Sequence, residues 1–340
     1  MKKILLTVTL SLALASNAMA AGDLRKEAID AGLIPIPSDS RALNKLIGNP
    51  DDKQVELGKK LFFDPRLSKS GLISCNTCHN LATGGVDGVA SAIGHGWTSN
   101  PHHLGSPTVY NSVFNAVQMW DGRFSSLEEQ AKGPIEAGPE MAAPAELVVD
   151  RIGSIPAYVE EFKRAFKGEK EPVNFDNMAR AIAAFERTLV TPSRFDSFLN
   201  GDSKALAENE KKGLSIFIGK GCAVCHGGIG IGGEGMQPFP VVGKFKHAGI
   251  GDFKGDKDGM VKVPLLRNIT NTAPYFHNGA VWSLSEAVRI MGENQLGEKL
   301  SDDEISNIVA FLGSLEGKKP EISYPMLPSS TKDTPKPDAN

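Results

Sequence analysis

The sequence predicts a mainly α protein with two domains and long irregular loops. The chain has 340 residues, more than one hydrophobic core usually supports, so two domains are expected. Apolar residues recur at helical spacing around two copies of one short motif, and glycine-rich stretches without such spacing follow both copies. The sequence therefore predicts that a unit of helix, loop and motif occurs twice, once in each domain.

The duplicated motif is a pair of cysteines three positions apart, followed directly by a histidine. Its two copies use all 4 cysteines of the chain and lie at Cys75, Cys78 and His79 and at Cys222, Cys225 and His226. This spacing is typical of covalent c-type haem attachment, in which the thiols form thioethers and the histidine binds the iron. The alternatives are two disulfides or a four-ligand zinc site, and zinc would leave the histidines unexplained. We therefore expect two covalently bound c-type haems, one in each domain.

The two ends of the chain differ in composition from the rest. Residues 1–20 are typical of a secretory signal peptide, because Lys2 and Lys3 precede a short apolar run and Ala18-Met19-Ala20 offers a cleavage site. The run is too short to span a bilayer, so no membrane span is expected. Haem attachment needs thiols in an exported compartment, which together with the signal predicts the periplasm. Residues 323–340 are rich in proline, serine and lysine, which predicts a disordered tail.

The overall charge is mildly acidic. The formal net charge of -3 includes the two lysines of the signal peptide, so the rest of the chain is slightly more acidic. This balance argues against nucleic acid as a partner. It would suit a small electron-carrier protein with a basic docking face, or it only confers solubility.

Domain boundaries follow from where the helical patterns start and stop. Residues 21–42 are expected to form an N-terminal arm that packs on the second domain. Asn49-Pro50-Asp51 then starts a helix of the first domain, residues 43–190, and Thr191-Pro192 ends the last helix of that domain. The second domain is expected to cover residues 191–322.

Each motif follows a helix that carries the same pair of residues. Gly58 and Phe62 stand four apart before the first motif, and Gly213 and Phe217 stand four apart before the second. A glycine at this place would let another helix approach closely, while the aromatic ring packs near the haem.

Capping boxes and apolar stripes predict the other helices. Capping boxes start three of them, at Ser125 with Glu128, at Ser283 with Glu286 and at Ser301 with Glu304. Gly133-Pro134 is expected to stop the first of these three. Further amphipathic helices are predicted over residues 145–152, 156–166 and 174–189.

The loop after the first motif contains a histidine between two glycines. His95 is a candidate second ligand of the first iron, because the backbone around it can move and could carry it on and off a metal. His102 and His103 are rivals for this role. A loop histidine that is only solvated is the simplest alternative.

Two further residues of the first domain are candidates for chemistry. Trp120 is either a packing residue or a relay for electrons between the haems. Glu140 lies among glycine, proline and methionine, which would desolvate its carboxyl group and suit it to proton transfer. An ordinary surface glutamate is the alternative.

The second domain offers methionine as an iron ligand. Met291 ends the apolar face of the helix that starts at Ser283, where a thioether either packs in the core or binds the second iron and raises its reduction potential. Met236 and Met260 are rivals from flexible loops. The glycine-rich stretch of residues 227–259 lacks the context and the ending of a phosphate loop, which excludes nucleotide binding there.

Taken together, the chain resembles the bacterial dihaem cytochrome c peroxidase family over nearly its whole length. The resemblance rests on ordered motifs: Cys-Asn-Thr-Cys-His, Gly-His-Gly-Trp, Trp-Asp-Gly-Arg, Ala-Lys-Gly-Pro, Arg-Asn-Ile with Tyr-Phe-His, and Arg-Ile-Met-Gly. It implies two cytochrome c-like domains. The first would hold a low-potential peroxidatic haem, and the second a high-potential haem that receives electrons.

The resemblance also implies roles for individual residues. The axial ligands would be His79 and His95 on the first iron and His226 and Met291 on the second. Glu140 would be the acid/base of the peroxide pocket with Gln130 as its companion, and Trp120 would lie between the haems as the electron relay.

The family also binds calcium at the domain interface, through an asparagine side chain and backbone carbonyls. Thr272 and Pro274 match the carbonyl donors. The asparagine position aligns best with Gly105, beside an apparent insertion around His102 and His103. The resemblance therefore implies calcium, with Gly105 as a departure from the family pattern.

The function implied by the resemblance is that of a periplasmic, homodimeric cytochrome-c peroxidase. It would reduce hydrogen peroxide to water with electrons from a small cytochrome c or cupredoxin. One alternative is a dihaem electron carrier without peroxidase activity, in which Glu140 would be incidental. The other is a dihaem oxidase that modifies a protein substrate, and Met291 argues against it because such enzymes carry tyrosine there.

Overall fold

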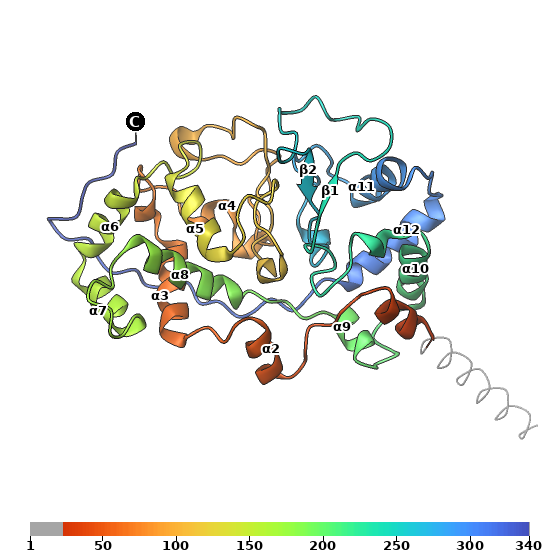
Figure 1. Ribbon diagram of the computed structural model, residues 1–340, viewed down its shortest axis with the longest axis horizontal. Helices are drawn as coiled ribbons and strands as arrows, with labels where there is room; N and C mark the ends of the chain where they lie inside the picture. Colours follow the sequence, from red (N-terminus) through yellow and green to blue (C-terminus); the bar gives the residue numbers. More distant parts are fainter. Residues whose placement is uncertain (1–22, 340) are drawn as a thin grey trace, which may run out of the picture.

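Two helical lobes lie side by side in the computed structural model, which describes residues 23–339 (Figure 1). The predicted signal peptide, residues 1–20, lies outside the described residues. The helices of the first lobe are α3 (Asp52–Phe63), α4 (Cys75–Cys78), α5 (Leu127–Glu136), α6 (Ala145–Gly153), α7 (Pro156–Ala165) and α8 (Phe175–Arg187). Those of the second lobe are α10 (Glu208–Gly219), α11 (Leu284–Met291) and α12 (Asp302–Ser314).

Short elements complete the fold. A helix over residues 23–30 and α2 (Ser40–Leu46) precede the first lobe, and α9 (Arg194–Leu199) leads into the second. The strands β1 (Met236–Pro238) and β2 (Met260–Lys262) pair antiparallel, with Met236 opposite Lys262. Single helical turns, and one π-helical segment, are η1 (Pro65–Leu67), η2 (Leu81–Thr83), η3 (His95–Trp97), η4 (Ser112–Phe114), η5 (Cys222–Val224), η6 (Ile269–Asn271) and η7 (Gly292–Leu296).

Each lobe has its own apolar core. The core of the first lobe includes Leu61, Phe162 and Ile182, and that of the second includes Phe195 and Phe311. No helix within residues 23–339 is long and apolar enough to cross a bilayer. Within each lobe the helices bury their apolar faces against one another.

The paired glycines of the sequence mark two close helix crossings. A Cβ atom on Gly58 would lie 1.8 Å from the carbonyl oxygen of Ala181 in α8. A Cβ atom on Gly213 would lie 1.9 Å from the carbonyl oxygen of Asn307 in α12. Both helices that precede a motif can thus approach a second helix only because they carry glycine, as the sequence predicts.

Helix α5 differs from the prediction at both ends. Its N-cap is Ser126 instead of Ser125, because the Ser126 hydroxyl accepts from the Glu129 N–H at 3.1 Å. The helix then continues through Pro134 to Glu136. Pro134 has no N–H to donate to the Gln130 carbonyl, so the helix continues for two more residues without that hydrogen bond.

The N-terminal arm contacts the second lobe. Ala28 and Leu33 belong to the apolar core of that lobe. The Ile36 N–H donates a hydrogen bond to the Asp196 carboxylate at 2.7 Å. The arm therefore contributes both apolar surface and a buried hydrogen bond to the second lobe.

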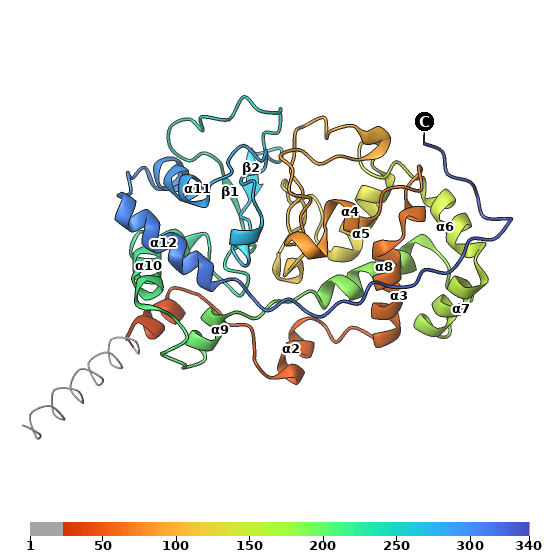
Figure 2. The same ribbon diagram turned by 180° about the vertical axis from the view of Figure 1, so that it is seen from behind.

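The structure differs from the disordered tail predicted for residues 323–340. The segment that follows α12 runs back along the first lobe (Figure 2). The buried guanidinium of Arg151 donates hydrogen bonds to the carbonyls of Pro335 and Lys336, at 3.2 and 2.8 Å. Because these bonds go to the main chain, the polar composition of the tail did not reveal them.

Candidate functional site

The first motif forms the one-turn helix α4, with His79 directly after it. The His79 N–H donates to the Cys75 carbonyl at 2.9 Å, which closes the turn. His79 Nδ1 lies 2.9 Å from the Pro107 carbonyl, and since a carbonyl only accepts, we assign the ring proton to Nδ1. Nε2 then keeps the lone pair that an iron ligand needs. Burial lowers the pKa of His79, which favours the neutral, metal-binding imidazole.

The cysteines of both motifs are free thiols and are partly buried. Burial raises the pKa of Cys75 and raises that of Cys78 to about 12, and the carboxylates of Asp87 and Glu140 add to the shift of Cys78. Burial likewise raises the pKa of Cys222 to about 11. The thiols are not joined as disulfides, which leaves them for thioether bonds.

The loop with His95 lies directly against the loop with Glu140. The His95 N–H donates to the Glu140 carbonyl at 2.7 Å. A Cβ atom on Gly94 would lie 2.0 Å from the carbonyl oxygen of Pro139, so only glycine fits there. His95 Nδ1 is buried and has no hydrogen-bond partner. The main chain thus brings His95 and Glu140 together and leaves the imidazole available.

The surroundings of Glu140 suit proton transfer. Desolvation raises the pKa of Glu140, and Arg123 opposes this shift. A carboxyl group with a raised pKa can both donate and accept a proton near neutral pH. Gln130 lies on α5, where its amide Nε2 is 3.9 Å from the Met119 sulfur. Among the described residues no hydrogen bond joins Gln130 to Glu140.

Trp120 lies where the two lobes meet. Its indole N–H donates to the Gly105 carbonyl at 3.0 Å, and its own carbonyl accepts from the Lys262 N–H at 2.8 Å. Together with residues of the second lobe, Trp120 lines the cavity that contains the second motif. This place fits an electron relay between the haems.

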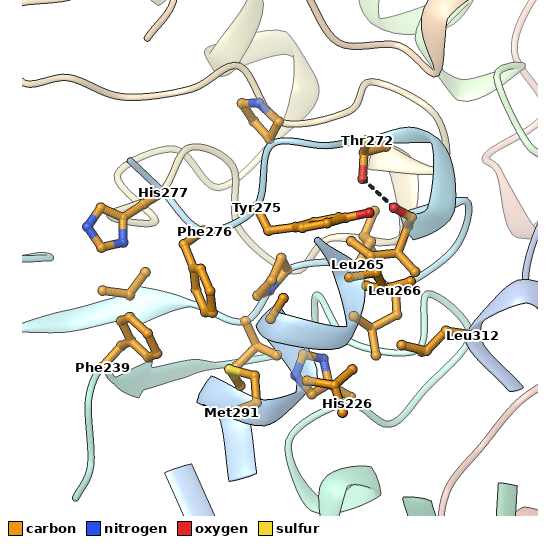
Figure 3. A pocket seen from close by; sticks show the side chains of 18 of the residues that line it. His226, Phe239, Leu265, Leu266, Thr272, Tyr275, Phe276, His277, Met291 and Leu312 are labelled. Carbon is orange, nitrogen blue, oxygen red and sulfur yellow. Dashed lines mark hydrogen bonds between the residues drawn. The ribbon is translucent and has the colours of Figure 1, made fainter. Parts of the chain in front are cut away.

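The second motif opens into a large cavity (Figure 3). The side chains of His226 and Met291 both line it, and Met291 is the last residue of α11. His226 Nδ1 is buried without a hydrogen-bond partner, and burial lowers the pKa of His226 to about 4. The ring of Phe217 lies 6.5 Å from the His226 ring, between centroids. The aromatic residue predicted to pack near the haem therefore does lie beside its histidine.

The rival ligands lie elsewhere. His102 is exposed, and its Nδ1 is hydrogen-bonded to the Asp252 carboxylate at 2.8 Å. Met236 and Met260 lie on β1 and β2 and are not among the residues that line the second cavity. Their positions favour His95 and Met291.

The three residues of the predicted calcium site line the same cavity. Gly105 comes from the first lobe, and Thr272 and Pro274 come from the second. The Gly105 N–H donates to the His277 carbonyl at 2.9 Å, which ties the two segments together. The Gly105 carbonyl already accepts the Trp120 indole N–H, and glycine offers no side-chain ligand. Within residues 23–339 there is no group of three or more His, Cys, Asp or Glu side chains that could hold a metal ion.

Sequence reasoning missed two residues of this cavity. Lys262 is only 4% exposed, and its place between Val261 and Val263 was the available signal that it is buried. His277 lies among aromatic rings, 5.3 Å from the ring of Phe253 between centroids, and burial lowers its pKa to about 4. Nothing in the spacing of the sequence indicated that these rings would surround it.

The residues present fit two c-type haems. Each site combines two free thiols with a buried imidazole. Each also has a candidate for the second axial position: His95, with a buried and unpartnered Nδ1, and Met291, which faces the cavity. Apolar side chains, such as those of Val263, Leu265 and Leu312, line much of the second cavity, as a porphyrin requires.

Comparison with protein families gives a match for each lobe. The family described as di-haem cytochrome c peroxidase matches residues 52–204. The family described as cytochrome c matches residues 210–316. The two matches support two cytochrome c-like domains.

Individual proteins are similar over most of the chain. The chain is 50% identical to cytochrome c551 peroxidase of Pseudomonas aeruginosa over 330 residues, which cover 94% of each protein. It is 47% identical to cytochrome c551 peroxidase of Nitrosomonas europaea over 289 residues, 83% of this chain and 85% of that protein. The crystal structure of a MauG-like protein associated with microbial copper homeostasis has a TM-score of 0.70 at 27% identity, covering 79% of this chain and 90% of the other.

Proposed function

Because the chain belongs to the di-haem cytochrome c peroxidase family, we propose that it reduces hydrogen peroxide to two molecules of water with two electrons and two protons. The chain carries two haems, in two cytochrome c-like domains. When bound, the haems supply the electrons, and the iron of the first haem is where peroxide reacts. The contact between the His95 loop and the Glu140 loop is the observation that carries this proposal.

The first site is the peroxidatic one in this proposal. His79 is the permanent ligand, fixed by its hydrogen bond to the Pro107 carbonyl. His95 is the ligand that leaves, because it sits on a loop in which Gly96 adopts the left-handed conformation with a φ of 67°. Its departure makes room for peroxide beside Glu140.

Glu140 moves the proton. Its carboxylate would take a proton from one peroxide oxygen and return it to the other, which would then leave as water instead of hydroxide. The desolvation that raises the pKa of Glu140 makes both transfers feasible with one group. Gln130 orients the peroxide by hydrogen bonding from α5.

The second site receives the electrons. His226 and Met291, which line one cavity, would hold its haem iron, and Trp120, which lines the same cavity, would provide the path for electrons to the first site. The donor is a small cytochrome c or cupredoxin of the periplasm, where the signal peptide directs the chain. The mature protein is a homodimer of chains with an arm (21–42), a first domain (43–190) and a second domain (191–322). Calcium binds between these domains through Thr272, Pro274 and Gly105.

The test is peroxide turnover by the purified dihaem protein with a reduced small cytochrome c. Glu140→Gln should lower turnover by about 10²- to 10⁴-fold, the usual contribution of a general acid/base. Both reduction potentials should stay close to those of the wild type. Glu136→Gln is the matched control, because Glu136 is an exposed carboxylate at the C-terminal end of α5, just before the loop that carries Glu140.

Two results would contradict the proposal at different levels. Full turnover in Glu140→Gln would remove the acid/base assignment. No turnover in the wild-type protein, with both haems present, would leave a dihaem electron carrier as the function.

A further inference from the structure

A buried lysine on the cavity of the second site has no carboxylate partner. Lys262 is the last residue of β2 and is 4% exposed. Within residues 23–339 no carboxylate lies near enough to influence its ammonium, and burial alone lowers the pKa of Lys262 to about 8. An unpaired buried ammonium is costly, so its place in the cavity needs an explanation.

The position of Lys262 is fixed from two sides. Its N–H donates to the Trp120 carbonyl at 2.8 Å, and its residue pairs with Met236 across the two-stranded sheet. Its ammonium lies 5.9 Å from the centroid of the Trp120 ring, within reach of a cation–π contact. That contact is worth about 2 kcal/mol when desolvated, which does not offset the burial of a full charge.

A haem bound at the second motif could supply the negative charge that the Lys262 ammonium lacks. Lys262, Cys222, Cys225 and His226 line the same cavity, so a haem bound to this motif lies beside the ammonium. A haem carries two propionate carboxylates, whereas the neighbours Val261 and Val263 are apolar. On this stretch of β2, the Lys262 ammonium is the side-chain group that could pair with a propionate.

We propose that the Lys262 ammonium forms an ion pair with a propionate of the haem attached at Cys222 and Cys225, on the edge of that haem that faces Trp120. Lys262 is then a positioning residue: it orients the haem edge toward the relay and keeps a positive charge near the second iron. This inference rests on the two haems of the family and not on peroxide turnover.

The charge has a consequence for the second haem. A positive charge close to an iron favours the reduced form over the oxidised form and so raises the reduction potential. At the first motif the carboxylates of Asp87 and Glu140 influence Cys78, and of these two only Asp87 also lines the second cavity. Lys262 therefore adds to the difference between the sites that the axial ligands create.

The experiment is a redox titration of the holoprotein in the absence of peroxide. In Lys262→Met one of the two one-electron transitions should move to lower potential, with at least a tenfold fall in the reduced-to-oxidised ratio at a fixed poise, equal to 59 mV. The other transition should move less. Lys262→Arg keeps the positive charge, so the potential of this transition should stay close to the wild-type value. Lys257→Met is the matched control, because the Lys257 side chain is 86% exposed.

A shift in Lys262→Met no larger than in Lys257→Met would overturn the proposal, and so would equal shifts of both transitions. If Lys262→Met does not assemble, a crystal structure of the wild-type holoprotein decides. Lys262 Nζ within about 4 Å of a propionate oxygen supports the pair, and an ammonium directed elsewhere overturns it. Neither readout depends on peroxidase activity, so a failure here is distinguishable from a failure of the proposed function.

Discussion

The first and second haem-attachment regions begin alike and end differently. In both, a helix with a glycine at a close crossing leads into the motif, through Gly58 in α3 and Gly213 in α10. In the first region the candidate second ligand, His95, lies on a loop of glycines. In the second region Met291 ends a regular helix that is capped by Ser283. In the proposed function, a duplicated scaffold thus supports one ligand that can leave and one that is held in place.

The two regions also differ in the charges near them. Two carboxylates, Asp87 and Glu140, act on the thiol of Cys78. Asp87 also lines the second cavity, but Glu140 does not, and that cavity contains the ammonium of Lys262. Both differences act in the same direction, because a negative field and two nitrogen ligands lower a haem potential, while a positive field and a thioether raise it. The comparison teaches that, with the proposed ligands, similar attachment units would acquire different potentials from residues outside the motif.

The largest loss of stability is expected from replacing the glycine that both regions carry at a close helix crossing. Gly58→Ala and Gly213→Ala should each lower the free energy of unfolding by about 3 kcal/mol, the upper part of the range for overpacking. The reason is that each new methyl group meets a main-chain carbonyl oxygen, at 1.8 Å and 1.9 Å, which cannot rotate away. Urea unfolding of the holoprotein measures the loss.

Gly219→Ala is the control for this pair. Gly219 also lies in α10, but nothing is within 4 Å of its Cβ position. Alanine there should stabilise the protein by about 0.4–1 kcal/mol, because it restricts the unfolded chain. If Gly58→Ala and Gly213→Ala were as harmless as Gly219→Ala, the shared close crossing would not be what positions the motifs.

A second prediction concerns the point where the two regions are joined. Thr191 is fully buried, and its hydroxyl lies 2.8 Å from the amide nitrogens of both Asn111, in the first lobe, and Asn268, in the second. Both asparagines have a positive φ and precede a single helical turn, η4 and η6. Thr191→Val should cost about 2 kcal/mol or more, because each orphaned buried donor costs about 1–3 kcal/mol.

Thr191→Ser tests whether the hydroxyl is responsible. It keeps the acceptor for both amides and loses only a methyl group, so it should cost about 1 kcal/mol. Urea unfolding measured for both variants gives the comparison. Equal losses in Thr191→Val and Thr191→Ser would mean that packing, and not the pair of amide hydrogen bonds, joins the lobes.

Much of this organisation was predictable because local chemistry determines it. The N-caps Asn174, Ser283 and Ser301 start α8, α11 and α12 as predicted, since side chains that satisfy free N–H groups act over a few residues. The two glycines were predictable because the same local pattern, a glycine four positions before a phenylalanine, precedes both motifs. The attachment motifs required only their spacing.

What was not predictable depends on partners far away in the chain. The tail is held by Arg151, which is 184 positions from Pro335. Lys262 meets the ring of Trp120 from the other lobe, and no property of either residue indicates the pair. The contact of His95 with Glu140 also joins two separate loops. Such contacts follow from the packing of the lobes and not from local patterns.

The smallest expected effect tests the mobility proposed for His95 at the first site. Gly96 follows His95 with a φ of 67°, and nothing lies within 4 Å of its Cβ position. Gly96→Ala should therefore strain the loop by about 1 kcal/mol without a clash. That strain should raise the fraction of half-reduced protein with His95 off the iron by roughly fivefold. Optical spectra of the half-reduced protein measure it as high-spin haem. Gly88→Ala is the control, since Gly88 has a φ of 71° and equally open space. An equal change in both variants, or none in Gly96→Ala, would mean that release of His95 does not depend on the conformation of this loop.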